Sequence, residues 1–190
     1  MQKTKNGRSL FRFLFILTPT FCLLYTLSQK KEVDLFHQLV AENKVADSLY
    51  NAATAMGNSK NYDETKEAEL NRKAIEIYND VFKKAPAEKE FDSIRFYSAF
   101  RIGELEHYFE NFSEALKGYA YAISVQLKSQ LPDSLLFKPY LYSGILCYNQ
   151  NKFDSASLFF KKAEGIQAAY DYRLQERERL FNTLDRKSVV

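Results

Sequence analysis

Small and aromatic residues recur in this chain at intervals of 41 positions. Ala74, Ala115 and Ala156 follow this spacing, and each has an aromatic residue four positions later. A fixed period of this length is typical of helical repeat arrays, in which neighbouring helix pairs share a core. The repeat positions are Ala74, Tyr78, Gly103, Phe112, Ala115, Tyr119, Ala122, Gly144, Phe153, Ala156, Phe160 and Ala163. We therefore expect these residues to be structural core positions.

Apolar residues also recur at three- and four-residue spacing after the N-terminal segment, which predicts amphipathic helices. A lead-in helix is expected at 29–44. Three helix pairs are expected at 45–86, 90–130 and 133–169, and the first half of a fourth pair at 172–184. The predicted fold is all-α, an α-solenoid of antiparallel helix pairs with a period of 41 residues.

Several residues mark the expected ends of these helices. Gly57 and Pro86 stop the two helices of the first pair. Ser113 is expected to cap the second helix of the middle pair, and Asp133 or Ser134 the first helix of the third pair. Further turns are expected at 110–111 and 149–152.

The first 28 residues have the composition of an export signal. Four basic residues precede an apolar run at 13–27, and no acidic residue occurs among them. This order predicts a signal peptide at 1–28 and an exported chain in the periplasm or cell envelope. The alternative is an inner-membrane anchor that uses residues 10–27 as a tether and leaves the array outside the cytoplasm. Pro19 and the shortness of the run favour the signal peptide.

The net charge argues against a nucleic-acid partner. The chain has 27 basic and 24 acidic residues. Removing the four bases of the first 28 residues leaves 23 bases against 24 acids, a formal charge of −1. Such a chain lacks the positive footprint that nucleic-acid binding uses.

The nucleophilic and metal-binding residue types are sparse and scattered. Cys22 lies in the leader, and Cys147 falls on the apolar side of an expected helix, where a small buried hydrophobe is the favoured interpretation. His37 and His107 are 70 positions apart and form no recognisable metal pair. No catalytic, cofactor-binding or metal-binding residue is predicted.

The repeat positions resemble those of the tetratricopeptide repeat (TPR) family. Gly103 with Ala115 and Tyr119, and the equivalent residues one period later, carry the resemblance. Their order matches a family in which small residues sit at helix crossings and large ones fill the space beside them. The period exceeds the commonest TPR length of about 34 residues, so longer helices or loops are expected.

The resemblance implies that the chain binds a protein or peptide on a concave face formed by the first helix of each pair. The oligomeric state stays open. Phe100 and Glu104 depart from the Lys and Asn pattern of members that hold a C-terminal carboxylate, so no such clamp is expected. By helical phase the face comprises Tyr97, Phe100, Glu104, His107, Lys138, Leu141, Ile145 and Tyr148.

The register of the repeat fails at Asp185, where a glycine is expected. Residues 185–190 match one translated reading frame of a common sequencing adapter, so we interpret them as a non-native tail. The chain would then be an N-terminal fragment. The alternative function is the recognition arm of a larger protein, because such arrays in Bacteroidota-type bacteria often precede a CHAT-type peptidase, a histidine kinase or a transcriptional regulator.

Overall fold

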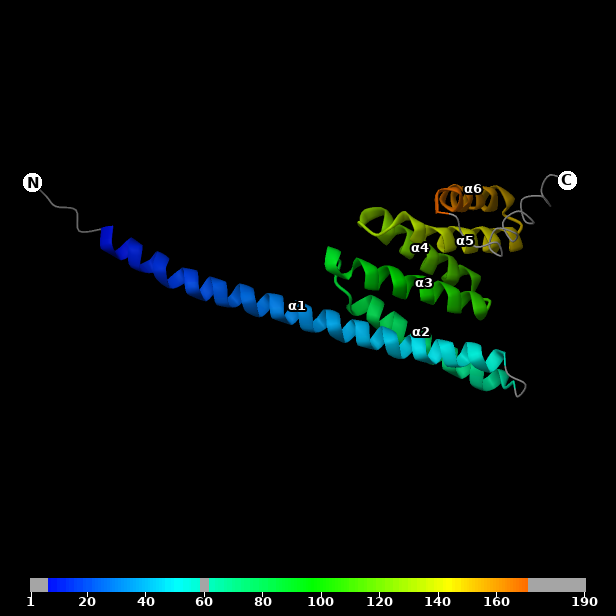
Figure 1. Ribbon diagram of the computed structural model, residues 1–190, viewed down its shortest axis with the longest axis horizontal. Coiled ribbons are helices and arrows are strands. Elements are labelled where there is room, and N and C mark those ends of the chain that lie inside the picture. The colour runs from blue at the N-terminus through cyan, green and yellow to red at the C-terminus, as the bar shows by residue number, and fades with distance from the viewer. Residues whose placement is uncertain (1–6, 59–61, 171–190) are drawn as a thin grey trace, which may run out of the picture. The chain divides into compact units, whose positions relative to one another are not determined.

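The computed structural model describes the backbone of residues 7–58 and 62–170, and this part of the chain is all-helical (Figure 1). The all-α prediction is confirmed for these residues. The two 3₁₀ turns, η1 and η2, precede the third and fifth helices. The α-helices are α1 (Gly7–Gly57), α2 (Glu64–Lys84), α3 (Asp92–Tyr108), α4 (Phe112–Lys128), α5 (Phe137–Asn149) and α6 (Phe153–Tyr170), and the 3₁₀ turns are η1 (Lys89–Phe91) and η2 (Asp133–Leu136).

The first helix is longer than expected. A signal segment, a lead-in helix and the first repeat helix were expected in succession, but α1 is continuous over Gly7–Gly57. No glycine or proline occurs between Pro19 and Gly57 to interrupt it. The chain divides into two compact units, Met1–Gln38 and Leu39–Val190. The second unit contains the helix packing described below.

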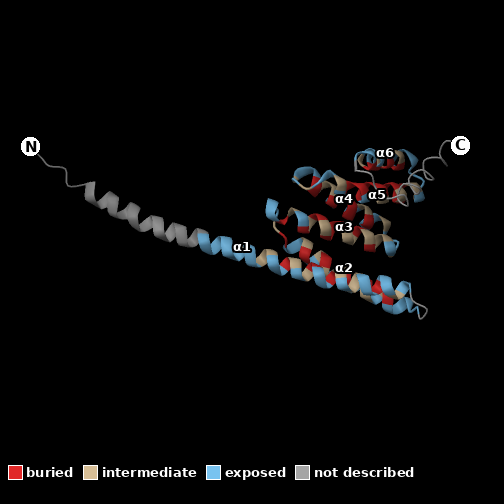
Figure 2. Cartoon of the chain, in the orientation of Figure 1, coloured by how far each residue is buried: buried red, intermediate tan, exposed pale blue. Residues whose placement is uncertain are grey.

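Within that second unit, consecutive helices pack against one another from α2 to α6. Figure 2 shows buried positions on each of these helices. The core is a series of clusters between successive helices. One cluster joins Ala46 of α1 to Ala74 and Tyr78 of α2. The next centres on Tyr119, and the third on Phe137 and Phe160.

The repeat positions explain how these clusters are built. The three alanines and the aromatic residues four positions later are buried. A Cβ atom on Gly103 would lie 2.7 Å from the ring of Tyr119, and one on Gly144 would lie 2.6 Å from the ring of Phe160. Each glycine therefore leaves room for an aromatic ring of the following helix, and the repeated pair fixes the separation of two helices.

Two repeat positions are not core residues. Phe153 is 42% exposed and Phe112 is half-buried. Both stand at the first position of a helix, α4 and α6 respectively. Phe112 contacts His107 edge-on, and Phe153 contacts Tyr148 in the same way. The expectation that all twelve positions are core is corrected at these two.

The turns between paired helices are confirmed, whereas two of the predicted caps are wrong. Glu110 and Asn151, which are 41 positions apart, both adopt a positive φ of 59°. However, α4 begins at Phe112, one residue before Ser113, and no side-chain hydrogen bond caps it. Residues 133–136 form η2, so neither Asp133 nor Ser134 caps α5. The chain changes direction between α4 and α5, and the 3₁₀ turn η2 forms this connection.

Three expectations fall partly or wholly outside the described residues. They are the half unit at 172–184, the tail at 185–190, and the side chains of the leader up to residue 25. In the part of the chain that the structure does describe, no helix has the length and apolar character needed to cross a membrane.

Candidate functional site

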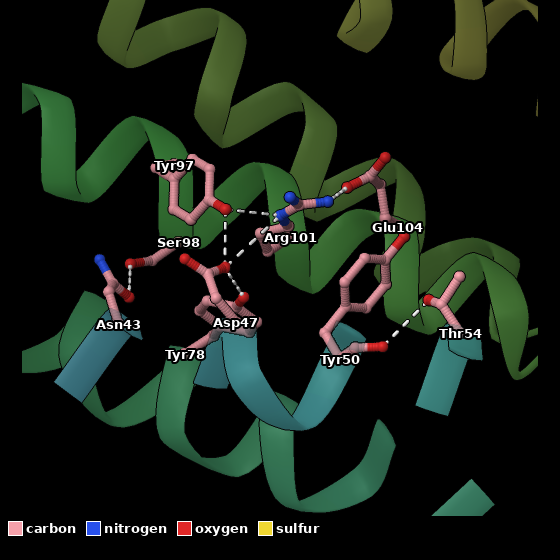
Figure 3. A network of polar contacts seen from close by, with 9 residues as sticks. All are labelled: Asn43, Asp47, Tyr50, Thr54, Tyr78, Tyr97, Ser98, Arg101 and Glu104. Atoms are coloured by element: carbon pink, nitrogen blue, oxygen red, sulfur yellow. Dashed lines mark hydrogen bonds and ion pairs between the residues drawn. The ribbon is translucent and has the colours of Figure 1, made fainter. Parts of the chain in front are cut away.

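Asp47 of α1 joins three helices through hydrogen bonds (Figure 3). Its Oδ1 atom accepts hydrogen bonds from the Tyr78 hydroxyl of α2 and, at 2.6 Å, from the Tyr97 hydroxyl of α3. One turn earlier on α1, the Asn43 side chain accepts a hydrogen bond of 3.1 Å from Ser98. The end of α1 is thus held to α2 and α3 by polar contacts as well as by apolar packing.

Arg101 extends this network along α3. Its Nε donates to the Tyr97 hydroxyl at 3.0 Å, and its Nη1 donates to Glu104 Oε2 at 2.7 Å. The guanidinium carbon lies 4.6 Å from the centre of the Tyr50 ring, within range of a cation–π interaction. Arg101 is therefore enclosed by aromatic rings and carboxylates.

Burial controls the electrostatics of this network. Burial and the hydrogen bond to Asp47 raise the pKa of Tyr78 well above its ordinary value. Burial also raises the pKa of Glu104, and the charges of Arg101 and Lys138 offset part of the rise. Although burial alone would lower it, the pKa of Arg101 is raised because it pairs with Glu104 and Tyr97. Arg101 is thus charged at any physiological pH.

A pocket of about 440 Å³ opens beside this network, and we call it the acidic pocket. It receives side chains from α1, α2, α3 and the segment between the first two helices. Two of them, Glu67 and Glu104, are carboxylates, and none is basic. The pocket is lined by Tyr50, Thr54, Gly57, Asn58, Tyr62, Glu67, Asn71, Glu104, Leu105 and Tyr108.

Glu67 is the buried carboxylate at one side of the acidic pocket. Its hydrogen bond with Tyr62, which is exposed, raises the pKa of that tyrosine to about 12. Burial, with the charge and hydrogen bond of Glu67, also raises the pKa of Tyr108. Gly57 leaves space for this carboxylate, because a Cβ there would lie 3.1 Å from Glu67 Oε1. Two tyrosine hydroxyls thus point their protons toward one carboxylate.

Asn71 lies one turn further along α2 and also lines the acidic pocket. Its side chain is 4% exposed. It shares a hydrogen bond with Tyr108, but its Oδ1 atom is buried without a hydrogen-bond partner. A buried acceptor left unpaired costs about 1–3 kcal/mol of folding free energy. The wall of the pocket therefore contains a buried, unsatisfied acceptor in addition to its carboxylates.

The eight residues expected on the concave face do not form one site. Tyr97 belongs to the Asp47 network, and Glu104 joins that network to the acidic pocket. Phe100 and Leu141 are buried core residues, which corrects their assignment to a surface. Lys138 is exposed and contributes only its charge, which acts on Glu104. The other three lie elsewhere: His107, Ile145 and Tyr148 are half-buried against neighbouring apolar side chains.

Sequence reasoning missed the residues that lie at the centre of the site. Asp47 and Arg101 were not singled out, nor were Glu67 and Asn71. One signal was available in the sequence. Asp47, Tyr50 and Thr54 have helical spacing and lie on one stripe of α1. A polar stripe beside an apolar stripe can contact a partner helix. The spacing alone did not reveal that partner.

Metal-binding and nucleophilic side chains were also considered among the residues that the structure describes. No group of three His, Cys, Asp or Glu side chains among them is placed to hold a metal ion. Cys147 is buried, and burial raises the pKa of its thiol. Comparisons with protein families, with curated proteins and with solved structures find no match to this chain.

Proposed function

We propose that this chain is an exported binding module, a TPR-type solenoid that holds a protein or peptide and carries out no chemistry itself. The contacts that recur after 41 residues support the solenoid. Gly103 and Gly144 each receive an aromatic ring of the next helix. The turn residues Glu110 and Asn151 share a positive φ of 59°. Equivalent contacts at a fixed interval are typical of stacked helix pairs.

The acidic pocket is the observation that carries the binding function. Tyr50 and Thr54 of α1 and Glu104 and Tyr108 of α3 line it, so it lies between the first helices of two successive pairs. In a solenoid of this type the first helices form the recognition surface. A pocket with several polar groups converging on an aromatic wall is the usual form of a binding site.

A peptide selection tests this function directly. The purified full chain is immobilised and challenged with a random peptide library, and the selected peptides are titrated into the free chain by calorimetry. We expect saturable binding at one site, with every peptide recovered unchanged by mass spectrometry. Failure to select any binding peptide, or cleavage of a bound one, would overturn the proposal.

We also propose that residues 1–28 direct export. The support is the order of basic residues followed by an apolar run. Fusing residues 1–44 to a reporter enzyme that is active only outside the cytoplasm should give activity. A matched fusion in which the four basic residues are replaced by glutamate should give much less. Equal activity of the two fusions would remove the support for an export signal.

A further inference from the structure

We propose that the acidic pocket binds the side chain of a lysine or arginine in the peptide partner. This inference rests on the binding function above and names the chemistry that its pocket recognises. The residues that carry it are Glu67, Asn71 and Glu104, which line the pocket together.

The first argument is the kind of polar atom that faces the pocket. The carboxylates of Glu67 and Glu104 can only accept hydrogen bonds when they are ionised. Asn71, whose Oδ1 is buried without a hydrogen-bond partner, lines the pocket beside them. No basic side chain lines the pocket. A ligand that satisfies these atoms must bring several donors and a positive charge, which describes an ammonium or a guanidinium group.

The second argument is a precedent within the same site. Arg101 places its guanidinium 4.6 Å from the Tyr50 ring centre and 2.7 Å from Glu104 Oε2. Tyr50 and Glu104 also line the pocket, together with Tyr62 and Tyr108. Tyrosine faces attract cations. The pocket therefore offers a second cation the same two kinds of partner that already hold Arg101.

The third argument concerns the balance of charge. Burial raises the pKa of Glu104, and the nearby charges of Arg101 and Lys138 reverse only part of this effect. Glu67 is 9% exposed, and the partners identified for it, Tyr62 and Tyr108, are neutral. A buried carboxylate without a cationic partner is stabilised by an incoming positive charge. The pocket volume of about 440 Å³ accommodates one long side chain but not a folded domain.

Peptide pools with one fixed central residue test the proposal. Fluorescein-labelled pools that carry lysine, arginine, citrulline or acetyl-lysine at that position are titrated into the full chain and followed by anisotropy. We expect the lysine and arginine pools to bind at least about tenfold more tightly than the two neutral pools, because a charge-assisted hydrogen bond contributes this much or more.

Glu67→Gln is the first variant, because it removes one carboxylate and leaves the Arg101–Glu104 pair intact. Glu104→Gln is the second. Each should reduce the preference for the basic pools by about tenfold. The matched control is the double variant Glu88→Gln with Glu114→Gln, which removes charge at exposed positions outside the pocket and should leave the preference unchanged. Circular dichroism confirms that each variant is folded.

The outcomes separate the two proposals. If all four pools bind equally and Glu67→Gln has no effect, the proposal that the pocket binds a basic side chain is overturned, while the proposal of a binding module stands. If no pool binds, both are overturned. If methylammonium or methylguanidinium competes as strongly as the lysine or arginine pool, the pocket recognises a free amine, and the assignment to a peptide is overturned.

Discussion

Replacing Gly118 with alanine tests whether the close approach of α3 and α4 holds this fold together. A Cβ atom at this position would lie 2.6 Å from the backbone nitrogen of Gly103 and 2.7 Å from its Cα. It would also lie 2.9 Å from the carbonyl oxygen of Ala99. All three atoms belong to the backbone of α3. No side-chain rotation can relieve these contacts, so the two helices must separate.

Two opposing terms set the size of the effect. Alanine in place of glycine inside a helix stabilises it by about 1 kcal/mol. Overpacking a tight core costs about 1–3 kcal/mol, and the upper end applies at Gly118 because the contacts are with backbone. We therefore expect a net loss of about 2 kcal/mol in the free energy of unfolding. Separating the helices would also loosen the Tyr119 ring against Gly103.

Gly165→Ala is the matched control, because Gly165 is also in a helix interior and has no atom within 4 Å of an added Cβ. It should raise the free energy of unfolding by about 1 kcal/mol. Urea denaturation followed by far-UV circular dichroism would compare the two variants with the parent chain, with an expected difference of about 3 kcal/mol between them. If Gly118→Ala were as stable as Gly165→Ala, the close helix approach would carry no energetic weight and the reasoning would be refuted.

Three further predictions concern the polar network and the buried side chains. Asp47→Ala should lower the free energy of unfolding by about 2–4 kcal/mol, because two hydroxyl groups and part of the Arg101 charge lose their acceptor; urea denaturation measures this. Burial raises the pKa of Tyr78 and Tyr119 above the unfolded value of 10.0. Their contribution to stability is therefore present below pH 10 and is lost as the pH rises above it. The absorbance of tyrosinate should show that these two residues ionise only as the chain unfolds. In a Cys22→Ser chain, Cys147 should react slowly with a thiol reagent when the chain is folded and rapidly in denaturant, as measured by absorbance.

Each of these predictions has a control or a contrary result. Asp80→Ala removes an exposed carboxylate outside the network and should change stability by less than about 1 kcal/mol. A similar loss for Asp47→Ala would contradict the role of the network. Ionisation of every tyrosine near pH 10 in the folded chain would contradict the burial of Tyr78 and Tyr119. Equal reactivity of Cys147 with and without denaturant would contradict its burial.

Much of the helix order could be predicted from spacing because helix formation depends on local periodicity. The start of α2 at Glu64 follows from the aspartate that caps it, Asp63, and its end at Lys84 follows from a nearby proline. The continuous helix α1 was not predicted because the change in composition after residue 28 was interpreted as the boundary between two structural segments. The start of α5 was missed because a 3₁₀ turn and a helix cap share the same residue types.

The candidate site was less predictable because periodicity shows which residues share a stripe but not what that stripe faces. Phe100 and Glu104 are one turn apart on α3, yet Phe100 is buried among aromatic rings while Glu104 reaches the acidic pocket. The difference arises because α3 packs against both α2 and α4, so most of its circumference meets other helices. The spacing of residues along α3 does not show which part of the helix surface packs against α2, which part packs against α4, and which part faces the pocket.

The sequence by itself determined the helical class and the identity of residues that space the helices. It did so because helix formation depends on local periodicity, and because each of the glycines marked by the sequence spacing leaves room for a ring, Gly103 for Tyr119 and Gly144 for Phe160. Only the tertiary structure decided the polar network and the acidic pocket. Asp47 meets Tyr78 and Tyr97 across 31 and 50 positions of sequence. These contacts occur at one helix junction and follow no period, because they depend on which faces of α1, α2 and α3 come together in space.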